Sequence, residues 1–271
     1  MSSATRQSTA AARERLEALT DNTSVDLDAL SGDLLDVTRV LDREVSLRRI
    51  LTDPAAPGQA KADLVGNLLQ GKVGADAQDL VSGMVRSRWA AGRDLADATE
   101  QLAALSLIIS ADKANELDEV EDELFRFGRV VASNVELRSA LTDQAASSSA
   151  KAQLVQNLLG GKAKAATVAL VTALVTQPRG RSLESGLEEY SRLAAGRRGR
   201  VVALVTTAVP MSDAQKDRLA VSLGSLVGRQ VHLNLDVDPS VLGGVRVEIG
   251  DEIIEGTIAS RLDSAQRGLA G

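Results

Sequence analysis

The chain of 271 residues contains no cysteine and a single histidine, His232. The lack of cysteine excludes disulfides, thiolate nucleophiles and cysteine-ligated zinc or iron–sulfur sites. A single histidine excludes sites with several histidine ligands. His232 also falls on the polar side of an expected strand, so we expect no histidine-based catalytic triad and a structural role for this residue. Serine and threonine are plentiful, but they lack the base that would activate them as nucleophiles. We therefore predict a chain that is not an enzyme by itself and that holds no cofactor and no metal ion.

Aromatic residues are also scarce, at 1% of the chain, whereas hydrophobic residues make up 44%. The core must therefore consist of leucine, valine, isoleucine and alanine, a composition that favours helices. The formal net charge of −6 argues against non-specific binding to nucleic acid. No apolar run approaches the roughly 20 residues that a membrane-spanning helix needs. We predict no nucleic-acid partner, and membrane association only through other proteins.

Three clusters have plain structural explanations. The acidic run Glu116–Glu123 (ELDEVEDE) is typical of a solvated helix face, and the alternative is a metal-dependent enzyme that uses this face. The arginines in 197–200 mark a domain boundary, where they serve as a solvated linker or as an anchor for an acidic partner. Gly243–Gly244 and Gly250 lack the spacing of a phosphate-binding loop and instead predict turns.

One segment occurs twice. Val45–Lys72 (VSLRRILTDPAAPGQAKADLVGNLLQGK) aligns without a gap with Val135–Lys162 (VELRSALTDQAASSSAKAQLVQNLLGGK), and 18 of the 28 residues are identical. Two copies are too few for a solenoid, but each copy is long enough to close as a helical bundle with its own core. We therefore predict two tandem helical bundles, residues 1–96 and 97–196.

The helices of these bundles are predicted from apolar spacing at i, i+3 and i+4. In Lys61–Leu69 the apolar residues follow one helix face, and Gly71 and its counterpart Gly161 supply C-terminal stops. The helix that begins after Gly92 is expected to close the first bundle and to start the second. Further helices are expected at residues 27–43, 75–89, 115–131 and 165–177.

The pattern changes after residue 196, where short β-branched segments begin. Strands are expected at 200–208, 231–237, 245–249 and 252–255, with a tight turn at Gly250–Asp251. Ser212 and Gln215 form a capping box that starts a helix ending at Gly228. With a closing helix at Thr257–Leu269, residues 197–271 form a small α/β (β-α-β-β-α) C-terminal domain, and the fold class is mainly α.

The stretch Leu235–Leu262 (LDVDPSVLGGVRVEIGDEIIEGTIASRL) resembles the signature of the delta subunit of F-type ATP synthases, the bacterial counterpart of the mitochondrial oligomycin-sensitivity-conferring protein. The resemblance extends upstream to about residue 97, and the first bundle is an additional copy, as in actinobacterial members. Glu248 stands where the family often has a basic residue, so we give that position no role. The matching signature residues are Val241, Gly244, Val245, Val247, Gly250, Asp251, Ile254, Gly256, Arg261 and Leu262.

The resemblance implies a non-catalytic stator subunit, present once per complex, that links the catalytic head to the b subunits of the peripheral stalk and resists rotor torque during ATP synthesis and proton transport. It implies a peripheral position on the cytoplasmic face of the bacterial cell membrane. The C-terminal domain would meet the b subunits.

The family's bundle receives the N-terminal helix of an alpha subunit of the head. The groove lies between its first and fifth helices, here about Ala98–Ser110 and Ala165–Gln177. Helical spacing selects the partner-binding candidates Leu102, Leu105, Ile109, Val168, Val171 and Val175. The alternative function is a soluble helical adaptor of another assembly, which would have no affinity for an isolated alpha-subunit helix.

Overall fold

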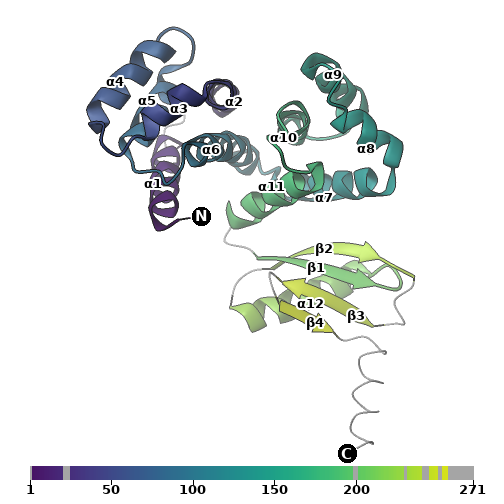
Figure 1. Ribbon diagram of the computed structural model, residues 1–271. Coiled ribbons are helices and arrows are strands. Elements are labelled where there is room, and N and C mark those ends of the chain that lie inside the picture. The colour runs from purple at the N-terminus through teal and green to yellow at the C-terminus, as the bar shows by residue number, and fades with distance from the viewer. Residues whose placement is uncertain are drawn as a thin grey trace, which may run out of the picture. The chain divides into compact units, whose positions relative to one another are not determined.

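The computed structural model describes residues 2–20, 25–197, 201–228, 231–239, 244–249 and 252–255. Over these residues the chain is mainly helical, with a small sheet near the C-terminus, which confirms the predicted fold class at this level (Figure 1). The chain divides into two compact units. The helical unit comprises Met1–Val120 and Val130–Gly186, and the sheet unit comprises Glu121–Arg129 and Leu187–Gly271.

Four successive helices recur with their bounds shifted by ninety residues, α2 to α5 as α7 to α10, because the duplicated sequence folds in the same way twice. Gly71 and Gly161, the two predicted stops, both have a positive φ, of 70° and 71°, which glycine adopts without steric cost. The helices are α1 (Ser3–Thr20), α2 (Leu27–Arg43), α3 (Val45–Thr52), α4 (Gly58–Leu69), α5 (Ala75–Arg86), α6 (Gly92–Lys113), α7 (Leu117–Ser133), α8 (Val135–Thr142), α9 (Ser148–Leu159), α10 (Ala165–Thr176) and α11 (Leu183–Arg197).

Helix α6 is the centre of the helical unit. It packs against α1, α2, α3 and α5 from the first copy of the repeat and against α10 from the second. From Leu95 to Ile109 almost every side chain is buried, including the small residues Ala103, Ala104 and Ser106. A helix covered on all sides needs apolar or small residues around its whole circumference, and α6 has them. That this helix closes one bundle and starts the next stays a prediction.

The sheet unit contains a four-stranded sheet in the order β2-β1-β3-β4. Strand β1 (Val201–Thr207) runs parallel to β2 (Val231–Val237) and antiparallel to β3 (Val245–Ile249), which pairs with β4 (Glu252–Glu255). The predicted hairpin is confirmed, because Ile249 pairs directly with Glu252. Its turn residues, Gly250 and Asp251, and the predicted closing helix lie outside the described residues.

Helix α12 (Asp213–Val227) connects β1 to the parallel strand β2. The predicted capping box is present, since the Ser212 hydroxyl accepts from the Gln215 backbone N–H and the Gln215 side chain accepts from the Ser212 N–H. Gly228 ends the helix with a φ of 68°, as predicted. The apolar core of this unit joins the sheet to α12 through Ala203, Val205, Leu223, Val231, Val247 and Ile249.

Candidate functional site

The six predicted partner-binding residues lie on α6 and α10, two helices that pack against each other. Five of them, Leu102, Leu105, Ile109, Val171 and Val175, are buried by the chain's own helices. Val168 alone among the six is partly exposed. Helical spacing places these apolar residues on one face of each helix, but it cannot distinguish a residue that lines a groove from one in the core. The role of these residues in binding a partner therefore stays a prediction.

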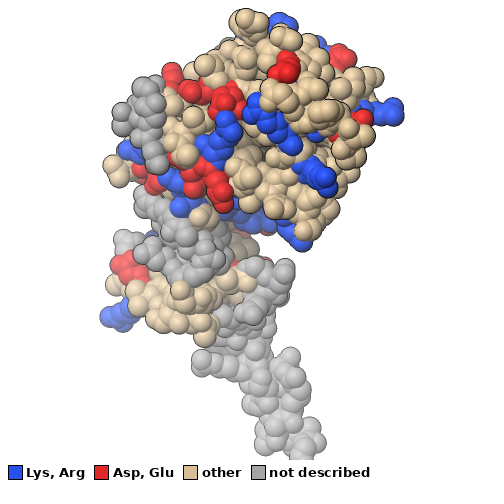
Figure 2. All heavy atoms as spheres, turned by 90° about the vertical axis from the view of Figure 1, so that its left-hand side faces the viewer, with Lys and Arg blue, Asp and Glu red and all other residues tan. Residues whose placement is uncertain are grey.

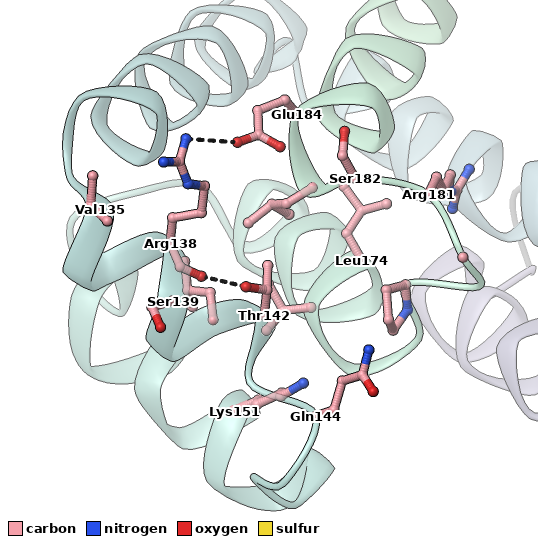
Figure 3. A pocket seen from close by; sticks show the side chains of 15 residues that line it. Val135, Arg138, Ser139, Thr142, Gln144, Lys151, Leu174, Arg181, Ser182 and Glu184 are labelled. Carbon is pink, nitrogen blue, oxygen red and sulfur yellow. Dashed lines mark hydrogen bonds and ion pairs between the residues drawn. The ribbon is translucent and has the colours of Figure 1, made fainter.

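A pocket of about 610 Å³ lies in the second copy of the repeat, between α8, α9, α10 and the segment that leads into α11 (Figure 3). We call it the α8 pocket. Leu141, Leu174 and Leu183 give it an apolar wall, and Val175 is the one predicted binding residue that lines it. The remaining lining residues are Val135, Arg138, Ser139, Thr142, Gln144, Lys151, Pro178, Gly180, Arg181, Ser182 and Glu184.

Polar groups are placed around this apolar wall. Arg138 on α8 pairs with Glu184 at the start of α11, at 3.7 Å, across one side of the pocket (Figure 3). The Thr142 hydroxyl donates to the backbone oxygen of Arg138 and so is satisfied within its own helix. Lys151 extends from α9 into the pocket (Figure 3). An apolar cavity of this size with a few polar groups is the usual form of a ligand-binding pocket.

A second polar cluster, the Arg179 network, lies between the two copies of the repeat. The Arg179 guanidinium donates to Asp42 on α2 at 2.6 Å and to Glu100 on α6 at 2.6 Å, and it pairs with Asp97 at 2.8 Å. Arg181 also pairs with Glu100, and Arg93 donates to the backbone oxygen of Arg179. The Arg179 side chain is only 5% exposed. One arginine thus ties the α10–α11 connection to helices from the other end of the unit.

Burial and pairing set the charges in this network. Burial raises the pKa of Asp97 above its ordinary value of 3.8, against the opposing effects of Arg179 and Arg93. Burial acts to lower the pKa of Arg179, but hydrogen bonds to Asp42 and Glu100 outweigh it and raise that pKa above its ordinary value. Arg179 is therefore a permanent cation, which agrees with the general behaviour of arginine.

The Arg179 network was not predicted from the sequence, although a departure from the repeat pattern at this position could have indicated it. Arg179 occupies the position of Trp89 in the first copy, so the duplicated pattern is broken there. Trp89 is buried and its indole N–H donates to the backbone oxygen of Met84. Arg179 adopts a φ of 52°, which is uncommon for a residue with a side chain.

The other charges are dispersed. On the face seen in Figure 2, basic and acidic side chains lie among one another. In the acidic run, Glu116 pairs with Lys164 at 3.0 Å, and within the described residues no group of three or more acidic or histidine side chains is placed to hold a metal ion. No helix in this part of the chain has both the length and the apolar character that crossing a membrane requires.

The signature residues divide between described and undescribed positions. Val245 and Val247 lie on β3, and Val247 is buried opposite Val205 of β1. Gly244 precedes that strand with a φ of 86°, in keeping with the predicted turn. Val241, Gly250, Asp251, Gly256 and Arg261 lie outside the described residues, as does the side chain of His232.

Comparison with known proteins supplies the family. The sequence pattern of the family described as ATP synthase delta (OSCP) subunit matches residues 102–269. A protein of Streptomyces griseus named ATP synthase subunit delta is 60% identical over the whole of both chains. One of the same name from Thermobifida fusca is 48% identical over 92% of each chain. A chain of the Toxoplasma gondii mitochondrial ATP synthase hexamer covers 62% of this chain and 95% of its own, at 22% identity and a TM-score of 0.37.

These matches define the class as a non-catalytic, structural subunit of an enzyme complex. The chain belongs to the family of ATP synthase delta (OSCP) subunits, and the resemblance noted in its sequence is confirmed. It is accordingly part of a membrane-associated complex.

Proposed function

We propose that this chain is the connector of the stator in an F-type ATP synthase, holding the catalytic head to the b subunits of the peripheral stalk. The observation that carries the proposal is the family match over residues 102–269, together with full-length relatives named ATP synthase subunit delta. A connector must resist torque, since otherwise the head would turn with the rotor. Two modest interfaces on one chain suffice, because engagement of one raises the effective concentration at the other and can increase avidity by about 10²–10⁴.

The domain arrangement of the proposal has two tandem helical bundles, residues 1–96 and 97–196, and a C-terminal domain at 197–271. The repeated helix bounds support it, because α2 to α5 recur as α7 to α10. Helix α6 is shared, as the sixth helix of the first bundle and the first of the second. A shared helix joins the bundles without a flexible linker, which suits a part that transmits force.

The head contact of the proposal is the N-terminal helix of an alpha subunit, docked along the seam of α6 and α10. Val168 supports this seam, because it is apolar and partly exposed, whereas its counterpart in the first copy is the polar Gln78. In the first copy, the seam that corresponds to α6 and α10 is formed by α1 and α5. That seam has Gln78 in place of Val168 and so lacks the equivalent apolar contact. The chain lies on the cytoplasmic face of the membrane through its partners, and one copy serves each complex.

A reconstitution tests the connector function. Membrane vesicles that carry the ATP synthase of the same organism are stripped of this chain, and it is then added back. We expect stripped vesicles to hydrolyse ATP without pumping protons, and the added chain to restore ATP-driven proton pumping measured with a pH-sensitive dye. Vesicles that pump normally without the chain would contradict the proposal.

The predicted seam has its own test. Replacing Val168 with glutamine, the residue of the first copy, removes one apolar contact worth about 1 kcal/mol, so affinity for a synthetic alpha-subunit N-terminal peptide should fall about fivefold. The matched control is Gln78→Val, which changes the equivalent position of the first copy and should leave that affinity unchanged. Equal peptide affinities for wild type and Val168→Gln would place the head contact elsewhere.

A further inference from the structure

One lysine of the α8 pocket has no partner among the described residues. Lys151 is 8% exposed as a whole residue, lines the pocket and extends into it (Figure 3). Within the described residues it forms no side-chain hydrogen bond and no ion pair, although the other charged lining residues, Arg138, Arg181 and Glu184, are all paired. Its aliphatic stem is buried, while its Nζ atom stays open to water in the pocket.

In the first copy of the repeat, the corresponding lysine has a backbone partner. Lys61, ninety residues earlier, is 5% exposed and donates to the backbone oxygen of Asp53 at 3.5 Å. Lys151 has no equivalent bond to Asp143, the counterpart of Asp53. The two lysines therefore share sequence context and burial, but only Lys151 retains an unused ammonium group.

In the first copy, the start of α6 packs closely against α3. Gly92 approaches α3 so closely that a Cβ there would lie 3.2 Å from the Cβ of Arg48 and 3.6 Å from the Thr52 hydroxyl. In the second copy, the counterpart of Gly92 is the exposed residue Ser182. The counterparts of Arg48 and Thr52 are Arg138 and Thr142, and both line the open pocket. The two copies thus differ at this position, where Gly92 packs close to α3 and Ser182 is exposed.

We propose that the α8 pocket binds a peptide segment of a partner subunit that carries an acidic side chain beside a bulky aliphatic one. The carboxylate pairs with the Lys151 ammonium, and the aliphatic side chain packs on Leu174 and Leu183. Charge complementarity supports this occupant, because a carboxylate satisfies the one unpaired cation of the lining while the apolar wall accepts a hydrocarbon side chain.

A peptide fits the pocket better than a small free anion does. The cavity of about 610 Å³ is many times larger than one carboxylate requires, and its apolar surface continues to Val135, which is 67% exposed. A peptide segment that enters the pocket across this apolar surface would cover Val135. This inference rests on the proposed function only in taking the partner to be another subunit of the same complex.

The test uses the full-length chain and 15-residue synthetic peptides that tile the other ATP synthase subunits of the same organism. Binding is measured by fluorescence anisotropy for wild type, Lys151→Met and the matched control Lys61→Met. We expect a peptide with an acidic residue beside an aliphatic one to bind wild type, and Lys151→Met to weaken that binding about tenfold to a hundredfold. Lys61→Met should leave the affinity unchanged within about twofold.

A double-mutant cycle makes the test specific to the pair. Changing the acidic residue of the peptide to its amide should lower affinity by a similar factor, with little further loss when Lys151→Met is added. The inference is overturned if no tiled peptide binds, if Lys151→Met binds as tightly as wild type, if both lysine variants lose affinity equally, or if free acetate competes as well as an unlabelled peptide. Because proton pumping in reconstituted vesicles is scored separately, a failure here leaves the connector function standing.

Discussion

Replacing Arg179 with glutamine should destabilise the helical unit more than any exposed charge change can. Removing one partner of a buried ion pair costs about 3–5 kcal/mol, because the remaining charge stays buried. Here Glu100 is 6% exposed and keeps Arg181, whereas the Asp42 and Asp97 side chains are 35% and 49% exposed and regain water. Exposed pairs contribute only about 0–1 kcal/mol. We therefore expect Arg179→Gln to lower the free energy of unfolding by about 2–3 kcal/mol.

The single tryptophan makes this measurable. Trp89 is buried in the connection between α5 and α6, so its emission reports on the helical unit. A loss of about 2–3 kcal/mol in a domain of this size lowers the melting temperature by about 5–10 °C. Thermal unfolding followed by Trp89 fluorescence measures that shift.

Two further variants isolate the cause. Arg39→Gln removes an exposed arginine, because both Arg39 and its partner Asp36 are 55% exposed, and it should shift the melting temperature by about 1 °C or less. Arg179→Gly should lose less stability than Arg179→Gln, because glycine removes the strain of the positive φ at this position. An Arg179→Gln protein that melts within 1 °C of wild type would refute the reasoning.

Two other changes have defined outcomes. Because its pKa is raised, the Asp97 carboxyl binds a proton more tightly in the folded state than in the unfolded state. The stability that this proton contributes is full below pH 3.8, the ordinary pKa of the unfolded chain, and is lost as pH rises through the folded pKa. The stability of wild type relative to Asp97→Asn, measured by urea unfolding, should therefore decrease with rising pH, and an increase would show that pairing with Arg179 dominates instead. Ser212→Ala removes the hydroxyl that accepts from the Gln215 N–H and should destabilise α12 by about 1 kcal/mol. Hydrogen exchange of the α12 amides should then be about fivefold faster, whereas unchanged exchange would show that the cap is dispensable.

Local sequence signals predicted most of the elements. The duplicated segment predicted repeated helices, the capping residues predicted the start of α12, and alternation predicted the strands β2 and β3. The capping and alternation signals act within a few residues, and the duplication is found by comparing two segments of the same chain, so a single sequence contains all of these signals. Gly71 and Gly161 are the clearest cases, because a positive φ at a helix end favours glycine wherever the rest of the chain lies.

The candidate sites depend on contacts between distant residues, which local patterns do not contain. Arg179 meets Asp42, 137 positions away, only because α6 brings the two copies together. The unused ammonium of Lys151 could not be predicted either, since its sequence context is almost the same as that of Lys61. One difference lies at a position distant in sequence, where the first copy has Gly92, packed close to α3, and the second copy has the exposed Ser182.

The duplication therefore separates two physical tasks that a single bundle would have to combine. The first copy covers α6 with close packing at Gly92 and contributes Asp42 to the Arg179 network, so it stiffens the helical unit. The second copy keeps an open pocket and a partly exposed apolar seam, which are features suited to binding. Buried ionic networks add little net stability compared with apolar packing, but they penalise any other arrangement of the helices that hold them. If the chain is the connector proposed above, a penalty on alternative arrangements matters more than a higher melting temperature. That is the physical reason to expect charged residues, rather than leucines, at the junction of the two copies.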